Sequence, residues 1–159
     1  MNRAPVVQAA WPAPRGVHAF TTLRHGAGVS QAPFYHFNLG NKYAADGDDP
    51  ATVARNRAQL AELAGLPSAP HWLKQVHGTD VVRVDGPPDR DAPEPVADAL
   101  VTTTPGVVLA ILTADCLPVV FAAKDGREIA AAHAGWPGLS KGMLEATLAA
   151  MRTPAADLV

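Results

Sequence analysis

Residues 113–136, TADCLPVVFAAKDGREIAAAHAGW, decide the fold of this chain. Within them Pro118 to Ala122 is a β-rich apolar run, and Lys124–Arg127 is a hairpin-type turn sequence. The turn returns the chain into a second extended run that ends at His133. Two strand ends that are joined by a hairpin are commonly neighbours in space, so we expect Cys116 and His133 to lie close together.

Outward from this hairpin, the pattern predicts more strands than helices. Extended runs are expected at Gly16–Thr22, His71–Val84, Ala99–Thr103 and Val107–Leu112, and the stretch from Pro5 to Pro14 is read as irregular. A turn at Gly78–Thr79 inside the second run places His77 at a strand end. The ten residues from Gly86 to Pro95, with four prolines, are a surface loop.

Two helices are expected. Asp49 as N-cap and Pro50 at the first helical position predict a helix start, with Gly65 as its stop. Pro137 opens a second helix, which ends near Arg152. Strands and helices therefore mix, and the sequence predicts a mixed α/β or α+β sheet structure in one domain over residues 1–159.

Composition narrows the functional classes. The chain has 159 residues, is 48% hydrophobic and carries a formal net charge of -2 from 13 basic and 15 acidic residues, without a block of like charge. This balance of charges argues against nucleic acid or an anionic membrane as a partner, and it is compatible with a small molecule as the partner. The apolar runs are too short to cross a bilayer. A single cysteine and the lack of a signal peptide at the N-terminus indicate a reducing cytoplasm.

Three side chains could carry chemistry: His77, Cys116 and His133. Zinc accepts cysteine sulfur and histidine nitrogen, and three protein ligands leave a fourth position for water or substrate. The same cysteine could instead be a nucleophile activated by a histidine base without metal. Taken singly, each residue is more often a buried hydrophobe or a hydrogen-bonded polar group. The residues alone leave all three interpretations open.

Seven ordered segments carry a more specific signal. They are Thr21–Ser30, Phe37–Gly40, Gly47–Pro50, Gln75–Gly78, Ala97–Thr102, Thr113–Pro118 and His133–Trp136. Together they resemble the YfiH family of laccase-domain, or polyphenol oxidase, proteins. The resemblance implies a layered αββα fold with mixed β-sheets and one zinc held by His77, Cys116 and His133.

The resemblance also implies an activity. Family members are associated with purine nucleoside phosphorolysis, in which adenosine, inosine or methylthioadenosine reacts with phosphate, and with adenosine deamination. An older attribution is copper-dependent phenol oxidation, and a role on peptidoglycan precursors has been proposed. Copper fits this sequence less well than zinc, because several copper centres need many ligands and the chain has six histidines without a His-x-His pair.

Each of these reactions suggests roles for particular residues. Beside the catalytic Cys116 and His133, Asp115 is a candidate proton carrier. Arg24, with nearby glycine amides, could bind phosphate, and Asn38 could hydrogen-bond sugar or base. The structural alternatives are a turn cap for Asp115, a surface cation for Arg24 and a loop-ordering amide for Asn38.

Two features depart from the family pattern. Pro137 stands where the family has arginine, and the family pattern continues well beyond Val159. We therefore expect a C-terminally shortened domain with open sheet edges that favour self-association. The alternative functions are a weakly active or inactive member that still binds zinc or a purine, and a Cys–His hydrolase acting on peptidoglycan precursors.

Overall fold

The computed structural model describes residues 4–40 and 42–159, and these residues form two compact units. The first unit comprises the described parts of residues 1–10 and 19–66, and the second comprises residues 11–18 and 67–159. The single domain expected over residues 1–159 stays a prediction. Among the described helices, none combines the length and the apolar composition that a bilayer crossing requires.

The first unit contains a short β-ribbon and one long helix. Strands β1 (Val6–Gln8) and β2 (Phe20–Thr22) pair antiparallel, and helix α1 spans Pro50–Ala64. At the start of α1 the Asp49 carboxylate accepts a hydrogen bond from the amide of Thr52 at 2.8 Å. At its end Gly65 adopts a left-handed conformation with φ 59°. Both predicted ends of this helix are confirmed.

The buried face of α1 includes a polar residue that the apolar pattern does not show. Asn56 is 1% exposed. Its Oδ1 accepts from the amide of Val29 at 3.0 Å, and its Nδ2 donates to Ser30 Oγ and to the carbonyl of Asn38. These bonds pair the amide of Val29 and the carbonyl of Asn38, two backbone groups that would otherwise lie unpaired beside this buried side chain.

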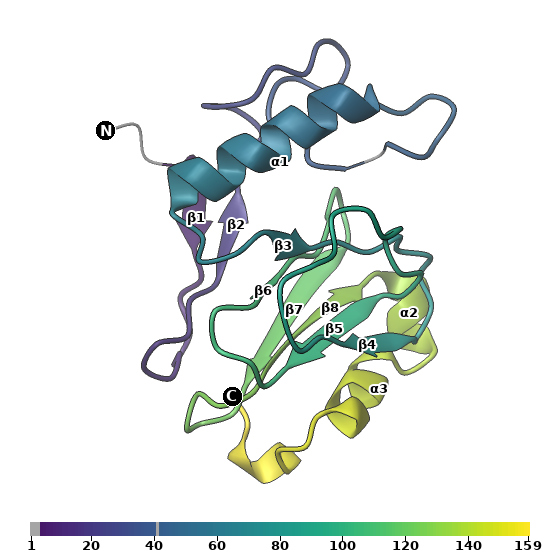
Figure 1. Cartoon of the computed structure of the whole chain (residues 1–159). Coiled ribbons are helices and arrows are strands. Elements are labelled where there is room, and N and C mark those ends of the chain that lie inside the picture. Colours follow the sequence, from purple (N-terminus) through teal and green to yellow (C-terminus); the bar gives the residue numbers. More distant parts are fainter. Residues whose placement is uncertain (1–3, 41) are drawn as a thin grey trace. The chain divides into compact units, whose positions relative to one another are not determined.

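The second unit is built on a four-stranded mixed sheet (Figure 1). Its elements are β3 (Pro70–His71), β4 (Val81–Arg83), β5 (Ala99–Thr102), β6 (Val108–Leu109), β7 (Leu117–Ala122), β8 (Ile129–Ala134), α2 (Trp136–Ser140), α3 (Met143–Ala150) and the 3-10 helix η1 (Ala155–Asp157). The sheet order is β4-β5-β8-β7, with β4 and β5 parallel and the other pairs antiparallel. Strands β3 and β6 form a separate parallel pair. The predicted mixed α/β class is confirmed.

The hairpin formed by β7 and β8 is also confirmed. Its register places Pro118 opposite His133 and Leu117 opposite Ala134. Cys116 directly precedes β7, so the register brings it to the end of β8 that carries His133. The hairpin therefore carries two of the three candidate residues on adjacent strands.

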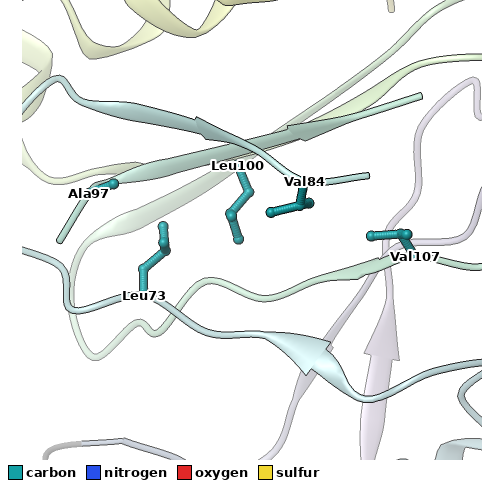
Figure 2. Close-up of a cluster of buried hydrophobic side chains, with 5 residues drawn as sticks. All are labelled: Leu73, Val84, Ala97, Leu100 and Val107. Carbon is teal, nitrogen blue, oxygen red and sulfur yellow. The ribbon is translucent and has the colours of Figure 1, made fainter. Parts of the chain in front are cut away.

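Each face of the sheet has its own core. On one face Leu73, Val84, Ala97, Leu100 and Val107 form a buried cluster, in which Leu73 and Leu100 point toward one another (Figure 2). Helices α2 and α3 lie on the other face of the sheet (Figure 1), where Met143 packs against buried alanines of β5 and β8. Each fully buried leucine-sized side chain contributes about 1.5–3 kcal/mol. Both cores hold the central strands in place beside the candidate site.

Three sequence expectations are wrong in detail. The helix expected from Pro137 to Arg152 is two helices, because the positive φ of Gly142, 91°, interrupts the helix between α2 and α3. The strand expected over Val107–Leu112 is only β6, two residues long. The stretch read as irregular between Pro5 and Pro14 contains β1, whose pairing with a distant strand has no local signal.

Candidate metal centre

His77 lies in the connection between β3 and β4 and has a left-handed backbone, with φ 58°. Histidine adopts this left-handed region more readily than most residues, but the conformation is still strained and has to be stabilised by neighbouring groups. That support comes from Asp98, whose carboxylate accepts the amides of Val76 at 3.2 Å, His77 at 2.9 Å and Gly78 at 2.7 Å. Three consecutive N–H groups thus fix the segment that carries the exposed imidazole.

The same carboxylate fixes His133. This histidine is 3% exposed on β8, and its Nδ1 lies 2.8 Å from Asp98 Oδ1. Burial on its own raises the pKa of Asp98, but the hydrogen bonds from His133 and from the amides of Gly78, Val76 and His77 outweigh it and lower the pKa. Because the ionised carboxylate only accepts, Nδ1 is the donor in this contact, and Nε2 is the ring nitrogen that could bind a metal.

Cys116 completes the group. Its Sγ lies 3.5 Å from His77 Nε2, and the ring centroids of His77 and His133 are 4.6 Å apart. One donor atom from each of the three residues lies within 4.8 Å of the others. Tetrahedral zinc places its ligand atoms about 3.3–3.8 Å apart. The donor atoms are therefore close enough to bind one ion with small side-chain movements.

Gly135 shows how tightly the group is packed. A Cβ atom on this residue would lie 2.7 Å from His77 Cδ2 and 2.9 Å from Cys116 Sγ. Its φ of -64° suits any residue, so glycine is needed here because of the close approach of the two candidate ligands, and not because of the backbone conformation. The chemistry of the donor set and this close packing fit a metal ion.

The environment of Cys116 disfavours a thiolate in the absence of a cation. Burial raises the pKa of its thiol, and the negative charge of Asp115 and a hydrogen bond to Asp115 Oδ1 at 3.7 Å raise that pKa further. A cysteine activated for nucleophilic attack needs the opposite shift. A bound cation would reverse it, because a coordinating thiol is deprotonated.

Comparison with known proteins places the chain in a family. Residues 17–158 match the family described as multi-copper polyphenol oxidoreductase laccase. The chain belongs to this laccase family. The YfiH resemblance is confirmed as well, because an Escherichia coli relative named purine nucleoside phosphorylase YfiH is 49% identical over 138 residues, covering 87% of this chain and 54% of that protein.

Other relatives of this laccase-family chain agree. A Xylella fastidiosa protein named purine nucleoside phosphorylase is 58% identical over 150 residues, covering 93% of this chain and 58% of the relative. A crystal structure of a Neisseria meningitidis protein has a TM-score of 0.83 at 41% identity, covering 97% of this chain and 60% of that one. YlmD from Geobacillus stearothermophilus has a TM-score of 0.84 at 31% identity, covering 99% and 61%. The chain thus spans less than two thirds of the length of these relatives.

The two predicted substrate residues of this laccase-family chain, Arg24 and Asn38, belong to the first unit. Arg24 donates through Nε to the carbonyl of Tyr35 at 2.6 Å and through Nη2 to the carbonyl of Pro33. Asn38 donates to the carbonyl of Gly40 and accepts from the amide of the same residue. These contacts order the loops of the first unit, and the substrate-binding roles stay predictions.

Sequence reasoning gave no role to Asp98, the residue that joins two of the three candidate ligands. Its signal was present, since Asp98 is a lone carboxylate inside the apolar run Ala97–Val101, and it is 0% exposed. A buried carboxylate needs several donors, and donors from loop amides do not show in a sequence. Gly135 was likewise read only as part of a motif.

Proposed function

We propose that this chain forms the zinc-binding part of a purine nucleoside phosphorylase. The observation that carries the proposal is the three-donor group of His77, Cys116 and His133, in which Asp98 orients both histidines. The names of the relatives support the reaction type. Zinc suits two imidazole nitrogens and one thiolate, and a reduced Cys116 suits the cytoplasm.

In phosphorolysis a phosphate oxygen attacks C1′ of the ribose while the bond from C1′ to the purine nitrogen breaks. The electron pair goes to the purine, which takes up a proton, and the products are the free base and the sugar 1-phosphate. Zinc bound by three protein ligands would supply a Lewis acid with one open position. The chain's own contribution is to orient the ligands through Asp98 and to offer Asp115, exposed beside Cys116, as a proton carrier.

Adenosine deamination is a second candidate. Water adds at C6 of the purine, the bond from C6 to the exocyclic nitrogen breaks, and ammonia leaves with the proton it gains. The specific observation in its favour is the position of Asp115 next to the ligand group, because this reaction needs a residue that moves a proton between water and the leaving nitrogen.

The test is a nucleoside assay on protein whose zinc content has been measured. We expect hypoxanthine release from inosine that depends on phosphate, and a loss of at least about 100-fold in His133→Ala. His18→Ala is the matched control, since this histidine lies outside the ligand group and should keep the activity. Ammonia release from adenosine without phosphate would identify the second candidate.

Absence of turnover in the zinc-loaded protein would refute the proposed activity. Retained zinc in that experiment would support the alternative of a binding protein without activity. Turnover in the metal-free protein that Cys116→Ala abolishes would instead support a Cys–His hydrolase.

A further inference from the structure

Helix α2 lies against the segment that carries His77. Gly138 approaches it so closely that an added Cβ would lie 3.2 Å from the carbonyl oxygen of Gly78. Gly135, just before the helix, contacts the His77 ring in the same way. The start and the middle of this short helix are therefore packed against the candidate metal centre.

Lys141 follows α2 directly and extends over the same segment. Its Nζ lies 3.4 Å from the carbonyl oxygen of His77, and the residue is exposed. This distance is at the long end for a hydrogen bond, and an ammonium has three donors, so at least two remain available. Among the described residues no carboxylate lies within ion-pair distance of Lys141, including Glu145 four residues later.

The charges around the centre make this ammonium important for an anionic substrate. Asp115 is exposed beside Cys116, and a metal-bound Cys116 is itself a thiolate. One divalent ion is offset by these two negative charges, so a phosphate dianion gains little attraction from them together. The ammonium of Lys141 contacts the backbone carbonyl of His77, one of the three candidate ligands.

We propose that Lys141 binds the phosphate co-substrate at the His77 side of the centre. This inference rests on the proposed phosphorylase function for its biological role, but not for the binding itself. An ammonium at the edge of a metal group acts on phosphate as a point charge, with donors that follow the oxygens as they move.

The experiment measures inorganic phosphate binding by calorimetry, and the KM for phosphate and for inosine, in zinc-loaded protein. For Lys141→Gln we expect phosphate affinity to fall about tenfold, with a matching rise in the KM for phosphate and the KM for inosine within about twofold. Lys141→Arg should restore most of the affinity, because it keeps the charge.

Lys124→Gln is the matched control, since Lys124 is also exposed and also donates to a backbone carbonyl, that of Ala156 at 2.6 Å. It should leave phosphate binding unchanged. Equal phosphate affinity in wild type and Lys141→Gln would overturn the proposal, as would a wild-type protein that binds no phosphate. If the wild type binds phosphate through Lys141 but turns over no nucleoside, the proposed function fails and this inference stands.

Discussion

Two buried carboxylates flank strand β8, and they have different tasks. Asp98 is 0% exposed beside the end of β8 that carries His133, and Glu128 is 2% exposed just before its first residue. Glu128 accepts the amides of Arg152 and Thr153, the Thr153 hydroxyl and Arg83 Nη2 at 3.1 Å. Both carboxylates thus satisfy several donors from segments far away in the sequence.

The difference lies in the residues to which the donors of each carboxylate belong. The partners of Glu128 make structural contacts only: the amides of Arg152 and Thr153 attach the segment after α3 to the sheet. The partners of Asp98 include His133, which keeps a free nitrogen, and the amide of His77, whose side chain offers another. A buried carboxylate with many donors is therefore a structural feature by itself, and it becomes part of a site only through a partner that can still bind.

The largest effect is expected for Asp98→Ala. It leaves three amides and one imidazole N–H without their acceptor, which costs about 3–5 kcal/mol in the free energy of unfolding. Metal affinity should also fall by about 10–100-fold, because both histidines lose their orientation. Urea denaturation and competition with a chromogenic chelator measure the two quantities.

Asp98→Asn keeps the size of the side chain and provides a folded variant if the alanine variant does not fold. It should lose less stability but still bind metal more weakly than wild type. Unchanged metal affinity in Asp98→Asn would remove Asp98 from the site and make it equivalent to Glu128.

Glu128→Gln tests the other side of the comparison. The new amide group points N–H donors at N–H groups of Arg152 or Thr153, and we expect a loss of about 2 kcal/mol in the free energy of unfolding. Metal stoichiometry should stay at the wild-type value. A folded Glu128→Gln protein that has lost its metal would contradict the division between scaffold and site.

Gly135→Ala should damage the site with little effect on the scaffold. The added methyl group forces the His77 ring and the Cys116 sulfur apart, so metal affinity should fall about tenfold, while the stability of the metal-free protein changes by less than about 1 kcal/mol. Gly86→Ala is the control, because an added Cβ there meets no atom within 4 Å. Equal metal affinity in the two variants would show that the close packing at Gly135 has no role.

A smaller effect is expected from pH. Burial on its own raises the pKa of Glu128, but the hydrogen bonds from Arg152, Thr153 and Arg83 outweigh it and hold the pKa below its ordinary value of 4.5. The stabilisation is therefore fully present above pH 4.5 and is lost as the pH falls through the lower folded-state pKa. Urea denaturation of metal-free protein should show a constant difference between wild type and Glu128→Gln near neutral pH. That difference should shrink in acid, and a difference that grows in acid would refute the account.

Local signals predicted much of this fold. Helix α1 has both its capping residues in the sequence, and the β7–β8 hairpin has a turn of the right composition. The pairing of β4 with β5 and of β3 with β6 is parallel and joins segments that are distant in the chain, so no local pattern specifies it. The break at Gly142 was missed because its neighbours keep helical spacing.

The candidate site, like the fold, was predictable from local sequence signals only in part. Cys116 and His133 were expected to be neighbours because a hairpin joins their strands, and their donor atoms do lie together with one of His77. The supporting residues Asp98 and Gly135 act through amides and close packing, which only the folded chain reveals. Residue types and their spacing thus predicted the three candidate ligands, whereas the residues that position them could be found only in the folded structure.

The most direct test of the account is a metal count by mass spectrometry on protein purified without chelators. The account predicts about one zinc per chain in wild type and in Glu128→Gln, and almost none in Cys116→Ala. A wild-type protein without metal would contradict it. So would a triple variant of His77, Cys116 and His133 to alanine that keeps the same metal content.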